Sequence, residues 1–244
     1  MSRSILITGA TRGLGQHLAR HFAARGYRLA LTGRDEQALL ALAQQLEGQA
    51  AQVVTAVLDV MDTDAIPGVL EHCAEALHGL DIVVANAGIA IAARGGKGQW
   101  QDMRKTIEVN VLGAMASAEA AIALFRRQGH GQLVGITSVA AMRGLPGQGA
   151  YCASKAAFSR FLQALRCETL RENIVITELA PGFIDTELNR GMPSRPFVVP
   201  AEKGTKIMAD MIEKEVAFRF VPGWPWALLG RLLPILPNRI VAGM

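Results

Sequence analysis

Short apolar runs alternate along the chain with longer stretches in which apolar residues recur every three or four positions. The runs, rich in isoleucine, leucine and valine, predict buried strands, whereas the longer stretches predict helices with one apolar face. The predicted strands are Ser4–Thr8, Arg28–Thr32, Gln52–Leu58, Asp81–Ala85, Gln132–Thr137, Ile174–Leu179 and Ala217–Val221. The predicted helices are Leu14–Arg25, Glu36–Leu46, Asp64–Leu77, Gln101–Arg127, Tyr151–Leu170 and Ala201–Glu215.

This alternation predicts an α/β fold, a doubly wound (Rossmann) parallel sheet of about seven strands with helices on both faces. Because crossovers are right-handed and ligands bind where the strand order reverses, we expect a cleft at the carboxyl ends of the first and fourth strands. No repeat or linker divides the chain, so we expect a single domain over residues 1–244. Prolines cluster from Met192 onward and predict irregular or short helical structure there.

The composition indicates a globular protein, because 50% of the 244 residues are hydrophobic and 19% are charged. Three cysteines, Cys73, Cys152 and Cys167, are an odd number and widely spaced, which is typical of reduced thiols in a cytosolic protein. The first apolar run, residues 5–7, is too short for a signal peptide or a membrane span. We therefore expect no targeting segment and a cytoplasmic location.

The charge pattern makes nucleic acid a poor candidate partner. The net charge is +4, without a basic run or interleaved aromatic residues. A phosphorylated small molecule would explain a few local arginines, and an ordinary solvated surface would explain most of them. His17 and His21 have the spacing of metal ligands on a helix, but a solvated face is favoured, and we predict no metal site.

A glycine-rich turn follows the first predicted strand and opens the first predicted helix. It reads Thr8-Gly9-Ala10-Thr11-Arg12-Gly13-Leu14-Gly15, and in this position glycines let backbone N–H groups approach a pyrophosphate. A tight structural turn is the alternative. The spacing G-x-x-x-G-x-G resembles the cofactor turn of the short-chain dehydrogenase/reductase family.

The end of the second strand decides which dinucleotide would bind. A carboxylate there would hold the ribose hydroxyls and repel a 2′-phosphate, but this chain has Gly33 followed by Arg34. Arg34 and Arg12 could converge on one phosphate, which favours NADP(H); two solvated surface charges are the alternative. Asp35 is either a helix N-cap or a mildly repulsive charge.

Tyr151 and Lys155 form a Tyr-x-x-x-Lys pair in a chain with two tyrosines and six lysines, where chance would supply one about 5% of the time. On a helix the two side chains share one face. A charge about 5 Å from the phenol, at an effective dielectric of about 20, is worth about 3 kcal/mol. We therefore expect the ammonium to lower the pKa of Tyr151 by about 2 units toward the working range of an acid/base group.

The family resemblance implies roles for further residues. It assigns Tyr151 as the acid/base, Lys155 as its electrostatic partner and ribose ligand, and Ser138 as the hydroxyl that orients the substrate. It also implies that Asn110 bends its helix and holds a water in a proton relay. Ser138 taken alone could be a turn former, and Asn110 a buried amide that the backbone satisfies. The implied cofactor-binding residues are Gly9, Thr11, Arg12, Gly13, Leu14, Gly15, Gly33, Arg34, Asp59, Val60, Asn86, Ala87, Gly88, Tyr151, Lys155, Pro181, Gly182, Ile184 and Thr186.

The expected activity is NADP(H)-dependent interconversion of a carbonyl and an alcohol by hydride transfer. Residues 1–135 would bind the cofactor, and residues 136–221 would carry catalysis and the substrate site, with the loop Asn189–Val199 closing over a small apolar substrate. A non-catalytic nucleotide sensor or scaffold is the alternative. The resemblance also implies a homodimer or homotetramer, formed through the helices predicted at Gln101–Arg127 and Tyr151–Leu170.

The C-terminal segment, residues 222–244, is apolar, and the stretch 221–237 is nearly charge-free and holds two of the three tryptophans. Prolines and an interior arginine exclude a bilayer span. Three interpretations remain, in order of preference: a lid over an apolar substrate pocket, a subunit contact, or an interfacial helix on a membrane surface. Core packing against the last strand is the simpler alternative and is compatible with the first two.

Overall fold

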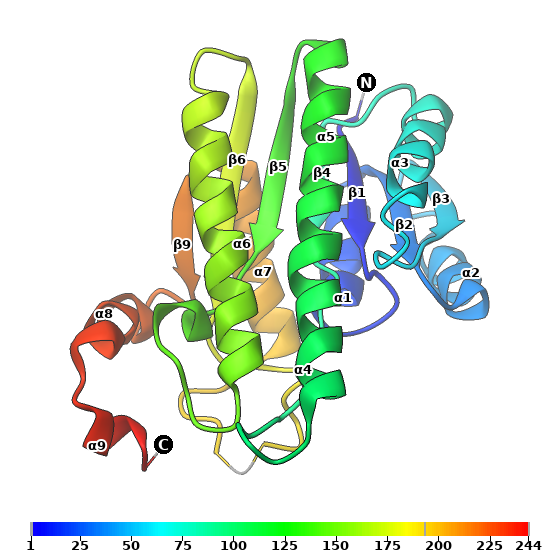
Figure 1. Ribbon diagram of the computed structural model, residues 1–244. Helices are drawn as coiled ribbons and strands as arrows, with labels where there is room; N and C mark the ends of the chain where they lie inside the picture. The colour runs from blue at the N-terminus through cyan, green and yellow to red at the C-terminus, as the bar shows by residue number, and fades with distance from the viewer. Residues whose placement is uncertain (1, 193, 244) are drawn as a thin grey trace.

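A computed structural model of the chain describes residues 2–192 and 194–243 and contains a seven-stranded parallel sheet (Figure 1). The strand order is β3-β2-β1-β4-β5-β6-β9, and a second, two-stranded sheet pairs β7 with β8. The strands are β1 (Ser4–Thr8), β2 (Arg28–Gly33), β3 (Gln52–Val57), β4 (Ile82–Ala85), β5 (Gly131–Ile136), β6 (Ile174–Pro181), β7 (Ile184–Asp185), β8 (Val199–Pro200) and β9 (Phe218–Val221). This is the doubly wound Rossmann sheet that the sequence predicts.

Helices cover both faces of the sheet. Figure 1 shows α5 and α6 in front of the strands and α7 behind them. One apolar core lies between the sheet and α1, α2 and α7, and another lies between the sheet and α3, α5 and α6. The helices are α1 (Gly13–Ala23), α2 (Glu36–Leu46), α3 (Ala65–Ala76), α4 (Trp100–Ile107), α5 (Ala114–Gln128), α6 (Gly149–Glu168), α7 (Ala201–Glu213), α8 (Trp226–Leu232) and α9 (Asn238–Val241). Two short 3-10 helices are η2 (Val139–Met142) and η3 (Leu233–Ile235).

The strand order reverses between β1 and β4, where the sequence places the cleft. Ile5 pairs with Ile82 on one side of β1 and with Leu29 on the other, so both neighbours run parallel to β1. The loops after β1 and β4 therefore diverge to opposite faces of the sheet and leave a crevice at its carboxyl edge.

The helix predicted at Gln101–Arg127 is interrupted. A π-helical turn, η1 (Glu108–Gly113), separates α4 from α5. Gly113 in this turn packs on the chain after β3, because a Cβ there would lie 2.7 Å from the Val60 carbonyl oxygen. The whole segment, residues 100–128, is long and apolar enough to cross a membrane, but half of its most apolar window is buried inside the fold.

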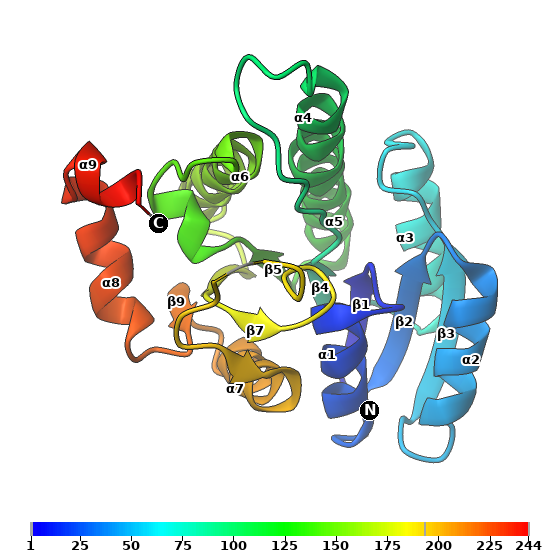
Figure 2. The same cartoon turned by 90° about the horizontal axis from the view of Figure 1, so that it is seen from below.

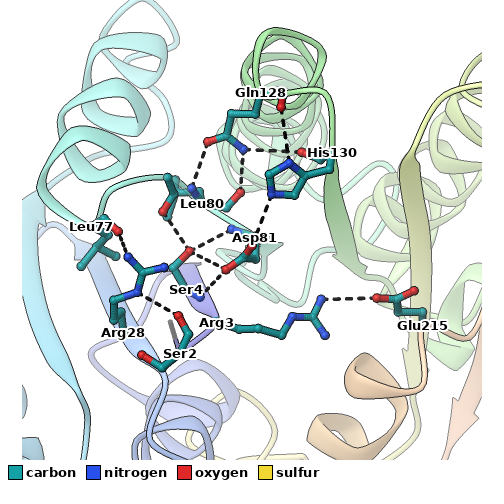
Figure 3. A network of polar contacts seen from close by, with 11 residues as sticks. Ser2, Arg3, Ser4, Arg28, Leu77, Leu80, Asp81, Gln128, His130 and Glu215 are labelled. Atoms are coloured by element: carbon teal, nitrogen blue, oxygen red, sulfur yellow. Dashed lines mark hydrogen bonds and ion pairs between the residues drawn. The ribbon is translucent and has the colours of Figure 1, made fainter.

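A polar network ties together the amino-terminal edge of the sheet (Figure 3). The backbone N–H of Ser4 donates to Asp81 at 2.7 Å, and the Ser4 hydroxyl donates to the Gly79 carbonyl at 2.8 Å. Arg28 donates to the carbonyls of Ser2 and Leu77. These contacts hold the first residues of β1 and β2 against the loop before β4, at the edge opposite the crevice.

Candidate active site

The turn between β1 and α1 is shaped by glycines that no other residue could replace without strain. Gly9 and Gly13 have φ values of +64° and +56°, a region that L side chains avoid. At Gly15 a Cβ would lie 2.3 Å from the Gly9 carbonyl oxygen. The first turn of α1 carries no acidic residue, and Arg12 at its N-cap position makes no side-chain cap. The N-terminal N–H groups of α1 thus lack side-chain caps, as an anion-binding helix end requires.

Asn86, the residue after β4, fastens this turn to the sheet. Its amide donates to the carbonyls of Thr8 and Gly9 at 2.8 and 3.2 Å. The Thr8 hydroxyl accepts from the backbone N–H groups of Asn86 and Ala87 at 3.0 and 3.1 Å. A Cβ on Gly88 would lie 3.4 Å from the Lys155 ammonium. Asn86-Ala87-Gly88 therefore links the glycine turn to Lys155.

The residues expected to bind the adenosine end of the cofactor lie at the corner formed by the ends of β2 and β3. Gly33 lies against Thr11 of the turn, since a Cβ on Gly33 would lie 3.1 Å from the Thr11 methyl group. The exposed Arg34 lies 3.8 Å from Asp59, and Val60 is buried. Asp35 accepts from the Ala38 N–H at 3.0 Å, so it is the N-cap of α2, one of its two predicted roles.

Ser138, Tyr151 and Lys155 come together at the carboxyl end of β5. Tyr151 and Lys155 lie on α6, with the ammonium 5.9 Å from the centre of the phenol ring. The ammonium is buried and donates to the Ile136 carbonyl at 3.0 Å. The Ser138 hydroxyl accepts from the Ala140 N–H at 3.1 Å, approaches the Pro181 carbonyl at 3.4 Å and faces the phenol. The three side chains expected to act together therefore share one site.

Burial, rather than the Tyr–Lys contact, dominates the titration of this pair. Removal from water raises the pKa of Tyr151, although a hydrogen bond with Ser138 opposes this shift. The same burial lowers the pKa of Lys155 from 10.5 to about 8. The expected lowering of the Tyr151 pKa is therefore wrong for this structure, because the sequence could show the spacing of the two groups but not their desolvation.

Asn110 lies in the π-helical turn, so the helix is locally distorted there, as the resemblance implies. Its amide oxygen accepts from the Ile89 N–H at 2.8 Å, and its amide nitrogen donates to the Ile89 carbonyl at 2.8 Å and to the Ser154 hydroxyl at 3.1 Å. Ser154 in turn donates to the Tyr151 carbonyl at 2.7 Å. The side chain is thus satisfied by backbone and by α6, which matches the alternative interpretation of a buried amide.

The segment after β6 runs from the neighbourhood of Ser138 back to the glycine turn. Ile184 is buried in β7, and Thr186 lies beside Gly13, whose Cβ would be 3.7 Å from the Thr186 side chain. The loop predicted at Asn189–Val199 lies between the paired strands β7 and β8, and its last residue is the first residue of β8. Arg195 bridges it to Asp185 at 2.5 Å and to Asn189 at 3.2 Å. Pro193 lies outside the described residues.

His17 and His21 face a neighbouring helix rather than open solvent. Both approach Glu202 of α7, at 3.5 and 3.4 Å, and His21 also contacts the Thr205 hydroxyl at 3.2 Å. Within residues 2–192 and 194–243, no three His, Cys, Asp or Glu side chains are placed to hold a metal ion.

Three residues near the site carry contacts that the sequence analysis did not assign. Thr8 lies in the glycine-rich turn and Ser154 lies between Tyr151 and Lys155. Threonine and serine hydroxyls often form hydrogen bonds with nearby backbone groups, so the residue types were a signal for these contacts. Trp226 of α8 packs against Gly182, and a Cβ on that glycine would lie 2.1 Å from the indole nitrogen. Only the fold brings these two positions together, so no local sequence signal could have found this contact.

Comparisons with known proteins show the family to which the chain belongs. The sequence profile described as short chain dehydrogenase matches residues 3–196. An uncharacterized oxidoreductase of Mycobacterium tuberculosis is 39% identical over 241 residues, covering 98% of this chain and 95% of the relative. An NADP-dependent 3-hydroxy acid dehydrogenase of Schizosaccharomyces pombe is 33% identical over 219 residues, covering 87% of this chain and 80% of the relative. An alcohol dehydrogenase of the archaeon Thermococcus sibiricus, solved with 5-hydroxy-NADP, superposes with a TM-score of 0.81 at 27% identity over 90% of this chain and 95% of its own. The chain is thus an oxidoreductase-type protein that belongs to the short chain dehydrogenase family.

Proposed function

We propose that the protein is an NADP(H)-dependent oxidoreductase that interconverts a carbonyl and an alcohol, with Tyr151 as the general acid/base. The observation that carries this proposal is the meeting of Ser138, Tyr151 and Lys155 at the edge of the sheet that also holds the glycine turn. Asn86-Ala87-Gly88 connects the two parts, so a molecule bound on the turn would reach the phenol.

The residues of the turn fit a dinucleotide. The start of α1 offers N–H groups that no side chain caps, and Gly15 leaves no room for a Cβ between the turn and Asn86. Gly9, Thr11, Gly13, Leu14 and Gly15 would hold the pyrophosphate, and the other cofactor-binding residues that the sequence predicts would hold the remaining parts. When bound, the nicotinamide supplies or accepts the hydride.

The adenosine side favours NADP(H) over NAD(H). No carboxylate stands at Gly33, the last residue of β2, where it would repel a 2′-phosphate. Arg12 and Arg34 are exposed near this corner, and guanidinium groups bind phosphate with forked hydrogen bonds. The names of the Schizosaccharomyces relative and the Thermococcus structure, which mention NADP, support the same choice.

Ser138, Tyr151 and Lys155 then deliver a proton to the substrate oxygen. Ser138 donates a hydrogen bond to the substrate oxygen and orients it toward the phenol. Because burial raises its pKa, Tyr151 keeps its proton at neutral pH and can give it to an alkoxide as that alkoxide forms. Lys155, with a pKa of about 8, is mostly charged at neutral pH and stabilises the phenolate left behind. This order of events favours carbonyl reduction.

Replacing Tyr151 by phenylalanine tests the proposal. Turnover of any carbonyl substrate should fall at least about a hundredfold, the contribution typical of a general acid, while the dissociation constant for NADPH stays within about twofold. Tyr27→Phe is the matched control, because Tyr27 is the other tyrosine and its hydroxyl donates to Glu213 at 3.1 Å. Wild-type turnover by Tyr151→Phe would overturn the assignment.

We also propose a cytoplasmic homodimer or homotetramer. Its contact would use α5, α6 and the turn between α4 and α5, where Leu112, Ala153 and Ala157 are exposed.

A further inference from the structure

The last part of the chain, residues 216–244, carries no acidic side chain. It holds three arginines, Arg219, Arg231 and Arg239, against the single carboxylate of the chain terminus. Arg231 and Arg239 are exposed, and neither forms an ion pair with another of the described residues. This part of the chain is therefore positively charged, and its exposed arginines are available to an anionic partner.

The helix α8 and the 3-10 turn η3 form one short apolar helix over Trp226–Ile235. Its inner side packs on β9, because Trp226 and Gly230 are buried and a Cβ on Gly230 would lie 2.6 Å from the Phe220 ring. This close contact fixes the rotation of the helix about its axis. Residues on the opposite side therefore cannot turn inward to be covered by the fold.

The opposite side of this helix is also apolar. Leu228, Leu232 and Ile235 recur every three or four residues and therefore share one side. Trp224 lies in the turn that leads into the helix, and these four side chains are between 39% and 77% exposed. Arg231 follows Leu228 by three residues and precedes Ile235 by four, so it lies on the same side. We call Leu228, Arg231, Leu232 and Ile235, with Trp224 beside them, the outer face.

The outer face belongs to a segment that is held firmly on the fold. Figures 1 and 2 show α8 and α9 beyond β9, at the end of the sheet opposite β3. Arg143, in the loop after η2, donates to the carbonyls of Pro234 and Leu236 at 3.2 and 3.3 Å and also to the side chain of Asn238. These contacts use the backbone and the inner side of the segment. The outer face is thus left exposed on a fixed support.

A row of large aliphatic side chains exposed on one helix marks a contact surface. Apolar residues on the same side as an arginine are typical of a helix that lies in a membrane interface, where the arginine stem packs with its neighbours and its charge reaches the headgroups. A second copy bound by two-fold symmetry would bring Arg231 of both copies together, without an acidic side chain in residues 216–244 to offset the charges. The charge of the outer face therefore favours anionic lipid over self-association. Composition alone ranks a membrane surface third, since it does not show that this side of the helix is free.

We propose that the outer face docks the protein on an anionic lipid bilayer. Leu228, Leu232 and Ile235 enter the boundary between headgroups and acyl chains, and Arg231 binds lipid phosphate. Trp224 joins them, because tryptophan rings prefer this boundary. The helix lies along the membrane surface, since its length of about 15 Å is half the thickness of the hydrocarbon core. This surface goes beyond the proposed oxidoreductase function and does not depend on it.

Vesicle flotation tests the proposal directly. The probes are phosphatidylcholine vesicles that contain phosphatidylserine and vesicles of phosphatidylcholine alone. The protein should float with the anionic vesicles and bind the neutral vesicles at least about tenfold more weakly, because arginines near an anionic surface are attracted to it. Added salt should weaken binding to the anionic vesicles, since it screens this attraction. Failure to float with either kind of vesicle, or equal binding to both, would overturn the proposal.

The double variant Leu228→Gln/Ile235→Gln removes two side chains of the outer face and changes no buried residue. Its affinity for the anionic vesicles should fall about a hundredfold, about tenfold for each partly inserted side chain. Leu170→Gln is the matched control, because Leu170 is 80% exposed beyond the end of α6, and it should bind vesicles like the wild type. Unchanged binding by the double variant would contradict insertion of the outer face, as would an equal loss in the control.

Arg231→Gln tests the electrostatic part of the surface. It should weaken binding to the anionic vesicles about fivefold and leave the weak binding to neutral vesicles unchanged. Arg171→Gln is the control, because Arg171 is an exposed arginine next to Leu170 and outside the outer face. The same loss on both kinds of vesicle, or the same loss in both variants, would refute a specific contact between Arg231 and lipid phosphate.

Tryptophan fluorescence locates the bound face. The variant Trp100→Phe keeps Trp224 and the buried Trp226. Anionic vesicles should shift its emission to shorter wavelength, and lipids brominated on their acyl chains should quench it. Trp100→Phe/Trp224→Phe, which keeps only Trp226, should show neither effect. A protein that floats without quenching of Trp224 would show that another surface binds the membrane.

Light scattering without lipid distinguishes the membrane from a second copy of the chain. The mass of the wild-type particle and that of Leu228→Gln/Ile235→Gln should be equal, because the outer face is expected to bind lipid. A smaller particle for the double variant, together with no flotation of the wild type, would assign the outer face to a subunit contact and overturn the proposal. These measurements need no turnover, so their outcome is separate from that of the proposed oxidoreductase function.

Discussion

Replacing Lys155 by methionine removes the charged group whose titration the fold changes most clearly. Lys155 is 6% exposed, and burial lowers the pKa of its ammonium from 10.5 to about 8. This shift means that the charged form costs the folded state about 3 kcal/mol relative to the unfolded chain. Below about pH 8 the whole cost is present. Between about pH 8 and 10.5 the folded chain releases this proton while the unfolded chain retains it, so the free energy of unfolding should rise with pH.

Urea denaturation of the wild type and Lys155→Met, from about pH 7 to about pH 10, measures this effect. Other titrating groups act equally on both proteins, so the difference between their unfolding free energies isolates Lys155. The wild type should gain about 2 to 3 kcal/mol relative to the variant across this range. The variant should also lose most of its turnover, because the phenolate of Tyr151 loses its positive neighbour. A stability difference that stays constant with pH would refute the burial argument.

Three further substitutions test other parts of the site. Arg34→Ala should weaken NADPH binding about tenfold or more and leave NADH binding unchanged, since one charge-assisted hydrogen bond is lost. Titration of the protein with each cofactor measures this, with Arg20→Ala as the control, and an equal loss of affinity for both cofactors would contradict selection of NADP(H) by Arg34. Gly15→Ala places a Cβ 2.3 Å from the Gly9 carbonyl oxygen. It should lower the free energy of unfolding by about 1 to 3 kcal/mol, measured by thermal denaturation, and abolish NADPH binding, measured by fluorescence titration. Normal affinity for NADPH would contradict the role of the turn in cofactor binding. Ala157→Glu puts a charge on the exposed face of α6 and should reduce the mass found by light scattering, whereas an unchanged oligomer would place the contact elsewhere.

Local spacing explains what the sequence could predict. The glycine turn and the Tyr151–Lys155 pair are short motifs, so residues close in the chain determine their geometry. The alternating apolar pattern predicted all seven strands of the main sheet. The π-helical turn at Asn110 was visible only through the family resemblance. Its shape depends on the Ile89 backbone and on Ser154, which come from other parts of the chain.

Tertiary contacts explain what the sequence could not predict. The pKa of Tyr151 shifts upward because of burial, and no spacing between two residues reveals how much water the fold removes. The contact between Trp226 and Gly182 spans separate elements, so the apolar composition of the C-terminal segment left three interpretations open. In the structure Trp226 is buried against Phe220 of β9, which is core packing against the last strand, and the three interpretations stay open.

The polar network around Ser4, Arg28 and Asp81 secures the sheet at the edge farthest from Ser138 and Tyr151. Contacts that stabilise the fold therefore lie at the amino-terminal ends of the strands, and the proposed catalytic residues lie at the carboxyl ends. Substitutions at the amino-terminal edge can therefore change the stability of the fold without altering the residues proposed to contact cofactor or substrate. Conversely, the crevice can be redesigned while the polar network stays intact.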